Sequence, residues 1–335
     1  MTAETDAAPP RVSVVMGVYN AAETLPAAVE GVLAQTFADW EFVIVDDGST
    51  DGTANRLAEY AAAEPRVRVI RQENAGLTAA LIRGCREARG EFIARQDADD
   101  VSAPERLERQ VALLRDTPGA GFVSCTTRYV APGGETLDLL SRPADPAEAT
   151  RALLHEHQGP PAHGSVLFRR DLYDAVGGYR KEFYYAQDSD LWLRMAERAL
   201  VAYVPEPLYD FRLSPHGISG SREALQRRFG EFGQACARGR RSGSGEAVPL
   251  EGAAVLREEV LAGRAARGGR GDGAGTNYLI ATRLLARGDR RAIRYLSKTL
   301  RRRPWHLKAW ARLAQSGWQA LRPPQASGVP EGGGE

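Results

Sequence analysis

The chain has 335 residues, of which 43% are hydrophobic and 26% are charged, and its formal net charge at pH 7 is +1. This composition is that of a folded globular protein with room for a large domain and a smaller appendage, and it excludes a chain that is disordered throughout. The charges are unevenly distributed, because residues 221–322 carry 22 Lys and Arg against 8 Asp and Glu, whereas residues 1–220 are acidic.

The N-terminal half alternates between short apolar runs and helical patterns, after a small, polar tail that we expect to be disordered over residues 1–10. Helical spacing of apolar residues predicts helices at 25–33, 57–61 and 77–88. Apolar, β-branched runs predict strands at Val12–Met16, Phe42–Val45, Val67–Ile70 and Phe92–Ala94. This alternation indicates the α/β class, with a mostly parallel sheet that helices cover on both faces.

Three of these strands are followed by polar loops, at Gly17–Asn20, Asp46–Ser49 and Gln96–Asp100. Ligands of such sheets bind outside the carboxyl ends of the strands, so we expect the loops to converge on one site. The last loop contains Asp97, Asp99 and Asp100. Neighbouring carboxylates repel one another and need solvent, hydrogen bonds or a cation, so we interpret this loop as a metal and nucleotide site.

The first loop lacks the glycine patterns of two common nucleotide-binding classes. Neither GxGxxG nor GxxxxGK[ST] follows the first strand. Their absence is evidence against a dinucleotide-dependent oxidoreductase and against a P-loop enzyme.

The catalytic domain is expected to span residues 11–221. Its second half is predicted to contain helices at 104–114, 147–155 and 188–199 and strands at 121–125, 164–168, 201–204 and 208–213. Residues 222–276 are predicted to form a Gly/Arg-rich linker with short helices, 277–322 a basic helical extension, and 323–335 a disordered tail.

The basic C-terminal third indicates a polyanionic partner, such as anionic lipid, a phosphate-bearing acceptor or nucleic acid, although a solvated helix surface explains the charges equally well. We expect peripheral contact with an anionic membrane through residues 221–322, or oligomer formation through the helical extension. No stretch reaches the roughly 20 apolar residues of a membrane span. The cysteines are widely spaced and the first residues lack a signal-peptide pattern, so we expect a cytoplasmic protein, peripheral at the inner face of the membrane.

Several segments, taken together, resemble the family 2 glycosyltransferases in order and spacing. The N-terminal half of that family is matched by Val12–Asn20, Gln35–Phe37, Glu41–Thr53, Asn74–Leu77 and Gly90–Asp100, and its acceptor half by Gly164–Phe168, Gly178–Tyr179 and Gln187–Arg194. The resemblance implies a GT-A fold of Rossmann-like type and transfer of a sugar, with inversion, from a nucleoside-diphosphate sugar that we expect to be UDP-linked. The acceptor is expected to be a glycan, a lipid-linked molecule or another hydroxyl compound in cell-envelope or exopolysaccharide synthesis, with no nucleic-acid partner.

The same resemblance assigns roles on the donor side. Asp99 is expected to bind a divalent metal, Mn²⁺ or Mg²⁺, and Asp97 the ribose or the metal's shell. Tyr19 is expected to pack against the base, and Asp47 to form a hydrogen bond with it. Oxygen ligands suit these cations, and a cation stabilises the charge of the leaving diphosphate.

Inversion also needs a base that takes the proton of the acceptor hydroxyl, and the matching carboxylate is Asp188. It stands at the start of a predicted helix, whose dipole would keep it ionised. The family usually has an acidic residue before this aspartate, where this chain has Gln187. Asp190 is an alternative base if the register is shifted by two residues.

Other polar and aromatic residues have simpler explanations. Asp46 and Asp51 are expected to be turn and cap residues, Asp100 a cap, and Trp192 part of the core. Two other functions remain open. One is a nucleotide-sugar-binding scaffold protein without turnover, and the other is a nucleotidyltransferase, although the phosphate loop of the latter is missing.

Overall fold

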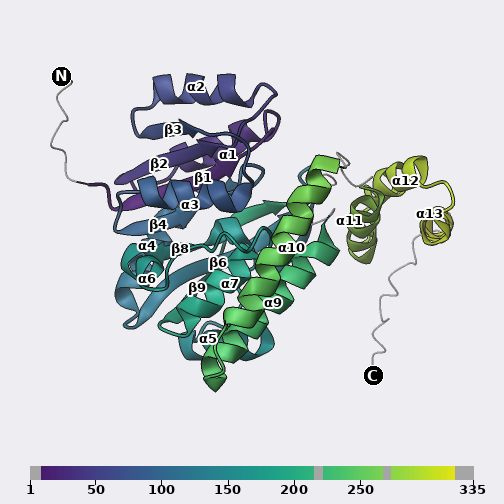
Figure 1. The fold of residues 1–335 in the computed structure, drawn as a ribbon. Helices are drawn as coiled ribbons and strands as arrows, with labels where there is room; N and C mark the ends of the chain where they lie inside the picture. Colours follow the sequence, from purple (N-terminus) through teal and green to yellow (C-terminus); the bar gives the residue numbers. More distant parts are fainter. Residues whose placement is uncertain (1–8, 215–221, 267–272, 321–335) are drawn as a thin grey trace, which may run out of the picture. The chain divides into compact units, whose positions relative to one another are not determined.

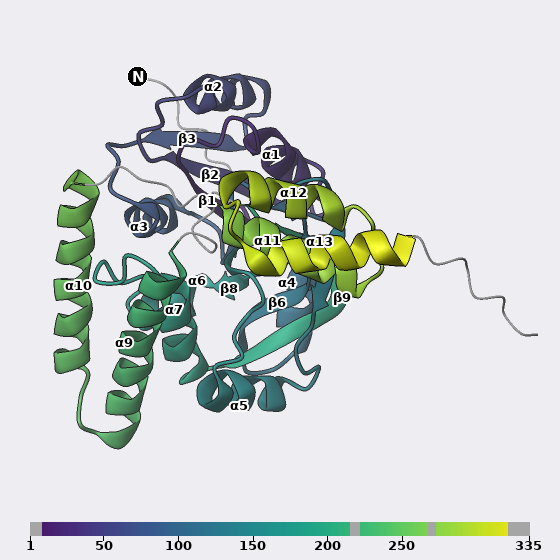
Figure 2. The same cartoon turned by 90° about the vertical axis from the view of Figure 1, so that its right-hand side faces the viewer.

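The computed structural model describes residues 9–214, 222–266 and 273–320 (Figure 1). These residues form two compact units, one containing 9–213 and 222–266 and the other containing 273–320. A second view shows the elements of each unit from the side (Figure 2). The tails expected at 1–10 and 323–335 lie outside the described residues, except for Pro9 and Pro10.

In the first unit the described strands form one sheet with the order β3-β2-β1-β4-β8-β6-β9-β5, and β7 pairs with β6. The pairings make β1 to β4, β6 and β9 run in one direction and β5, β7 and β8 in the other, which confirms the mostly parallel sheet. The strands are β1 (Val12–Val18), β2 (Trp40–Asp46), β3 (Val67–Arg71), β4 (Phe92–Arg95), β5 (Val101–Ser102), β6 (Ala120–Val130), β7 (Thr136–Leu140), β8 (Leu167–Arg169) and β9 (Leu200–Arg212).

Helices cover both faces of this sheet, as the apolar strands predicted. Successive residues of β1 face opposite sides: Val14 and Met16 pack with α1, α2 and α4, whereas Val15 packs with α3 and α7. The helices are α1 (Leu25–Leu33), α2 (Thr53–Ala63), α3 (Leu77–Glu87), α4 (Arg106–Asp116), α5 (Pro146–Glu156), α6 (Arg170–Ala175), α7 (Gln187–Ala196), α9 (Glu223–Ser242) and α10 (Ala247–Ala266).

The closing strands differ from the prediction. In place of two strands there is one, β9, of 13 residues. Val204 pairs with Cys125 and Pro207 with the next residue, Thr126, so Pro205 and Glu206 bulge out of the ladder. The bulge accommodates prolines within a continuous strand, which is why the sequence looked interrupted.

Residues 222–266 also differ from the expected linker with short helices. They form α9 and α10, each of 20 residues, which are joined by a short glycine-containing turn. Phe229 and Cys236 of α9 share a buried cluster with Phe183, which precedes α7. Arg240 pairs with Glu197 at 2.7 Å. The first unit therefore continues beyond the expected boundary at residue 221.

The second unit contains α11 (Ala274–Ala286), α12 (Ala292–Arg302) and α13 (Leu307–Ala320), in the region where the helical extension was expected. Ile280, Leu284 and Leu296 are fully buried in it. Within the described part of the chain, no helix is both long enough and apolar enough to cross a membrane.

Candidate active site

The three polar loops lie at one edge of the sheet, as predicted, because β1 pairs in parallel with both β2 and β4. Hydrogen bonds join the first two loops. The Asn20 N–H donates to Ser49 Oγ at 3.0 Å, and the Thr50 N–H donates to Asn20 Oδ1 at 2.8 Å. The Gln96 N–H donates to Val15 O at 3.1 Å and fixes the third loop beside β1.

The carboxylates after β4 form a poorly neutralised cluster. Burial raises the pKa of Asp99 to about 6, and the charge of Asp97 adds to the rise. Burial, followed by the charges of Asp99 and Asp97, also holds the pKa of Asp100 well above its usual range. Asp100 Oδ1 accepts a 2.8 Å hydrogen bond from the Arg212 N–H of β9, whereas its Oδ2 has no hydrogen-bond partner among the described residues. Asp100 therefore ties this loop to β9, and the expectation that it caps a helix is wrong.

This cluster fits a divalent cation. Its donors are carboxylate oxygens, which Mg²⁺ and Mn²⁺ prefer, and a cation would neutralise charges that now repel one another. The described side chains contain no preformed group of three or more His, Cys, Asp or Glu that could hold a metal ion. A site of one or two carboxylates completed by substrate phosphates is a common way in which Mg²⁺ is bound.

Arg95, which sequence reasoning missed, lies at the centre of the site. Its side chain is fully buried at the end of β4 and donates to Asp97 Oδ1 at 2.7 Å and to the carbonyl oxygens of Val15 and Gln96. Its Nε donates to His163 Nε2 at 3.3 Å. An arginine within an apolar strand, two residues before a carboxylate, was the signal available in the sequence, since a buried cation needs a buried acceptor.

His163 accepts the hydrogen bond from Arg95 Nε and is itself positioned by a tyrosine. Its Nε2 lies 2.6 Å from the hydroxyl of Tyr179. Burial, followed by the charge of Arg95, lowers the pKa of His163 well below its usual range, so the imidazole is neutral. Because Arg95 has only donors, Nε2 is the accepting nitrogen and the Tyr179 hydroxyl also donates to it.

Asp188, the predicted base, stands in the first turn of α7, next to this network. Burial raises its pKa and the charge of Asp97 raises it further, against the opposing effects of the Ser189 N–H and Arg95. Burial therefore opposes ionisation of Asp188, and the expectation that the helix dipole keeps it ionised stays a prediction. Because the charges of Asp97 and Arg95 act on Asp188, the loop after β4 and the predicted base lie near one another.

The alternative base, Asp190, has a structural role. It is buried and accepts hydrogen bonds from Arg194 at 2.7 and 3.0 Å within α7. Trp192 is 2% exposed and stacks on Phe122 with ring centroids 5.7 Å apart, so it belongs to the core as predicted. Gln187, at the unusual position before Asp188, is buried as well.

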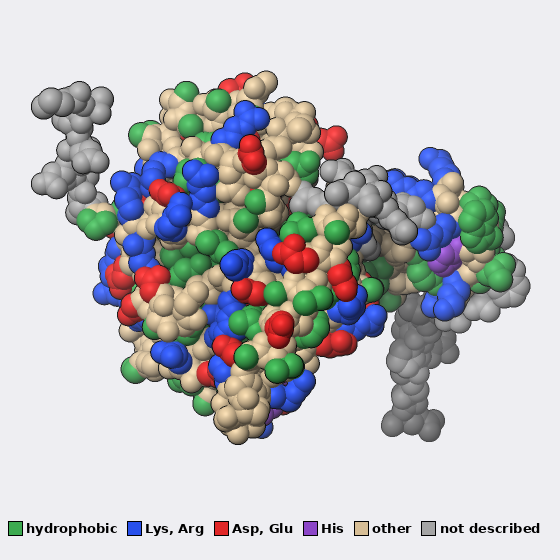
Figure 3. All heavy atoms as spheres, in the orientation of Figure 1, with side chains coloured by type: hydrophobic (Ala, Val, Ile, Leu, Met, Phe, Trp, Pro, Cys, Tyr) green, Lys and Arg blue, Asp and Glu red, His purple; other side chains and the backbone are tan. Residues whose placement is uncertain are grey.

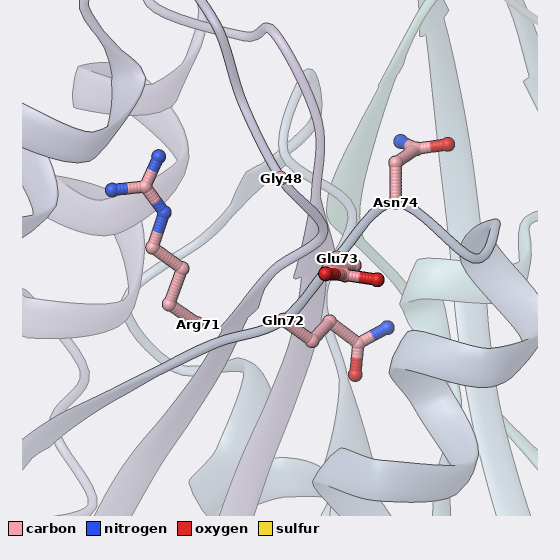
Figure 4. Close-up of a pocket in the computed structure, with 5 residues that line it drawn as sticks. All are labelled: Gly48, Arg71, Gln72, Glu73 and Asn74. Atoms are coloured by element: carbon pink, nitrogen blue, oxygen red, sulfur yellow. The ribbon is translucent and has the colours of Figure 1, made fainter.

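Asp47 organises a neighbouring loop. Its carboxylate accepts hydrogen bonds from Gln72 Nε2 and from the N–H groups of Ala75 and Gly76, each at 2.8 Å. This loop lines an open pocket of about 550 Å³, where Figure 4 shows the Arg71 and Asn74 side chains on opposite sides of Gly48. The predicted contact between Asp47 and a base stays a prediction.

The remaining residues of the first two loops lie as follows. Tyr19, the predicted partner of the base, follows β1 and is 44% exposed. Asp46 Oδ1 accepts from the Ser49 N–H at 3.0 Å, and Asp51 Oδ1 from the Thr53 N–H at 2.9 Å. Asp46 and Asp51 are turn residues, as expected.

Comparisons with known proteins point in one direction. Residues 13–177 match the family described as Glycosyl transferase family 2. The putative glycosyltransferase EpsE of Bacillus subtilis (strain 168) is 36% identical over 213 residues, which cover 61% of this chain and 73% of EpsE. The chondroitin synthase of Escherichia coli is 30% identical over 222 residues, which cover 64% of this chain and 30% of that longer enzyme.

A solved structure shows the same architecture. The mannosyltransferase PcManGT from Pyrobaculum calidifontis, in complex with GDP-Man and Mn²⁺, superposes with a TM-score of 0.53 at 23% identity, over 95% of this chain and 84% of that chain. At this identity the likeness concerns the fold, and it confirms the fold expected from the sequence.

Proposed function

Because this chain belongs to glycosyl transferase family 2 and is a glycosyltransferase, we propose that it transfers a sugar from a nucleoside-diphosphate sugar to a hydroxyl group with inversion at the anomeric carbon. The observation that carries the proposal is the hydrogen-bonded chain from Asp97 through Arg95 and His163 to Tyr179, which joins the loop after β4 to the second half of the catalytic domain. Along this chain the charge of Asp97 raises the pKa of Asp188. These two residues come from the donor loop and the acceptor half of the chain. An inverting transferase needs a donor site and a base on either side of one reacting carbon.

On the donor side, Asp99 would hold Mn²⁺ or Mg²⁺ and Asp97 would contact the nucleotide sugar with the oxygen that Arg95 leaves available. Tyr19 would pack against the base, next to the loop that Asp47 holds. A bound cation would supply Lewis-acid stabilisation of the leaving diphosphate. PcManGT, which has the same fold, binds GDP-Man and Mn²⁺, and this supports a nucleotide sugar and a divalent cation as the ligands of this chain.

On the acceptor side, the Asp188 carboxylate would accept the proton of the attacking hydroxyl. The hydroxyl oxygen forms a bond to the anomeric carbon as the bond from that carbon to the diphosphate oxygen breaks on the opposite face, which inverts the carbon. A raised pKa makes Asp188 a stronger proton acceptor than an ordinary aspartate.

We further propose a glycan or lipid-linked acceptor in cell-envelope or exopolysaccharide synthesis. The similarity to chondroitin synthase, an enzyme named for a polysaccharide, supports this class of product. A lipid-linked acceptor would also explain why a basic segment accompanies the catalytic unit.

The donor can be identified by thermal unfolding. We expect a UDP-sugar with Mn²⁺ to raise the unfolding temperature, since a ligand at 100 times its Kd stabilises the folded state by about 2.7 kcal/mol. GDP- and dTDP-sugars and a chelator serve as comparisons. Failure of every nucleotide sugar to stabilise the protein would contradict the proposal, and donor binding without transfer to any acceptor extract would favour the scaffold alternative.

Replacing Asp99 by Ala is expected to remove the metal-dependent part of this stabilisation. The metal-free variant should be at least as stable as the wild type, because the mutation deletes one of three mutually repelling carboxylates that are buried or partly buried. Asp116→Ala, at an exposed aspartate that ends α4, is the matched control. Equal Mn²⁺-dependent donor binding in Asp99→Ala and the wild type would exclude Asp99 as the metal ligand.

A further inference from the structure

We propose that the α12–α13 surface docks the protein on an anionic lipid bilayer. This surface consists of the exposed residues Arg301, Arg302, Arg303, Trp305, Leu307, Lys308, Trp310 and Arg312. It belongs to the second unit, and the proposal does not depend on sugar transfer.

The apolar part of this surface is unusually exposed. Trp305 is 78% exposed, Leu307 80% and Trp310 52%. The second unit has a core without them, since Leu296 and Ala309 are fully buried. Leaving large apolar side chains in water forfeits the stabilisation that burial gives, so a patch of this kind indicates an interaction site.

Contacts within the turn between α12 and α13 fix the residues that flank these exposed side chains. Trp310 Nε1–H donates to the carbonyl oxygen of Pro304 at 2.8 Å, which links the start of α13 to the turn before it. The His306 ring lies against Tyr278 of α11, with centroids 4.6 Å apart. Trp305 and Leu307, on either side of this anchored histidine, remain directed to solvent.

The charge of the second unit complements an anionic surface. Residues 274–320 contain eleven Lys and Arg and a single acidic residue, Asp289, which pairs with Arg291 at 2.6 Å. Residues 222–266 contain eight basic and six acidic residues, and Arg240 among them pairs with Glu197, which belongs to the same first unit. The basic surplus of the C-terminal third is therefore concentrated on the unit that carries the exposed tryptophans.

Figure 3 shows hydrophobic side chains beside Lys and Arg side chains on this unit, at the right of the view. Tryptophan and leucine next to basic residues are typical of segments that lie in a membrane interface, where the rings enter the headgroup region and the cations meet anionic lipid. A soluble polyanion would pair with the arginines but would leave Leu307 in water. The combination therefore favours a bilayer.

Co-sedimentation of the full chain with vesicles tests the proposal. We expect binding to vesicles of phosphatidylcholine mixed with phosphatidylglycerol, weakened by salt, and little binding to phosphatidylcholine alone. The double variant W305A/L307A should lower the affinity about tenfold through lost apolar contact. R301Q/K308Q should lower both the affinity and its salt dependence.

V248A/V255A is the matched control, because these α10 residues are 80% and 56% exposed but lie on the first unit. Its vesicle binding should equal that of the wild type. Circular dichroism confirms that each variant is folded. Loss of binding in R301Q/K308Q with none in W305A/L307A would mean that charge alone binds a polyanion, and it would overturn the proposal. The proposal would also be overturned if the wild-type protein did not bind vesicles but self-associated through Trp305 and Leu307.

Discussion

Replacing Asp188 by Asn is expected to abolish sugar transfer while leaving donor binding largely intact. A positioned general base contributes about 10²–10⁴-fold to the rate, and Asn has nearly the same shape but cannot take the acceptor proton at neutral pH. The change leaves Arg95 and the loop with Asp97 and Asp99, the proposed donor side, untouched. Steady-state transfer rates and donor-dependent thermal stabilisation, measured on the same preparation, separate the two effects.

The matched control for Asp188→Asn is Asp171→Asn, which also removes a carboxylate from the first turn of a helix, here α6. The control should retain full activity. Wild-type activity gives a second test through its pH dependence. Because burial raises the pKa of Asp188 above the usual range of an aspartate, the rate should fall on the acid side of the profile at a higher pH than it would with an ordinary aspartate. Full transfer activity in Asp188→Asn would exclude the proposed mechanism.

Replacing Arg95 by Met is expected to have the largest effect on stability. The side chain is fully buried and neutralises Asp97, so its loss leaves the carboxylates after β4 without their internal cation. Breaking a buried ion pair costs about 3–5 kcal/mol, and the partial exposure of Asp97 places our expectation at the lower end of that range. Chemical unfolding measures this change.

Donor affinity should fall together with the stability of Arg95→Met, because Asp97 would lose the hydrogen bond that orients it. Arg95→Lys would restore the charge but not the contacts to two carbonyl oxygens and His163, so we expect an intermediate result. Arg115→Met, at an exposed arginine in the last turn of α4, controls for the loss of a positive charge. Wild-type stability and donor affinity in Arg95→Met would show that Arg95 is dispensable.

Much of the first half of the fold follows from the sequence, because buried parallel strands are nearly continuous apolar runs. The apolar runs that begin at Val12 and Phe42 predicted β1 and β2. Together with the polar loop after β4, they also predicted the edge of the sheet at which the three loops meet. The ends of elements were harder to predict. Pro205 and Pro207 suggested a break where the strand bulges and continues.

The hydrogen-bond partners of buried polar side chains could not be predicted from the local sequence pattern. Arg95 depends on His163, which lies in another segment, and only the folded chain shows that the two meet. The raised pKa of Asp188 likewise reflects burial by tertiary packing, whereas the helix dipole is a local property. Asp47 belongs to a recognisable motif, yet its hydrogen bonds to Ala75 and Gly76 depend on a loop across the sheet edge.

The hairpin of α9 and α10 defines how far the catalytic unit can be shortened. Truncation at residue 221 would remove Phe229 and Cys236 from the cluster around Phe183 and would expose the segment that leads into α7 and Asp188. It would also delete Glu246, the partner of Arg180 at 3.0 Å. A truncated protein intended to retain catalysis without the lipid-docking surface should therefore end after residue 266, where α10 is complete.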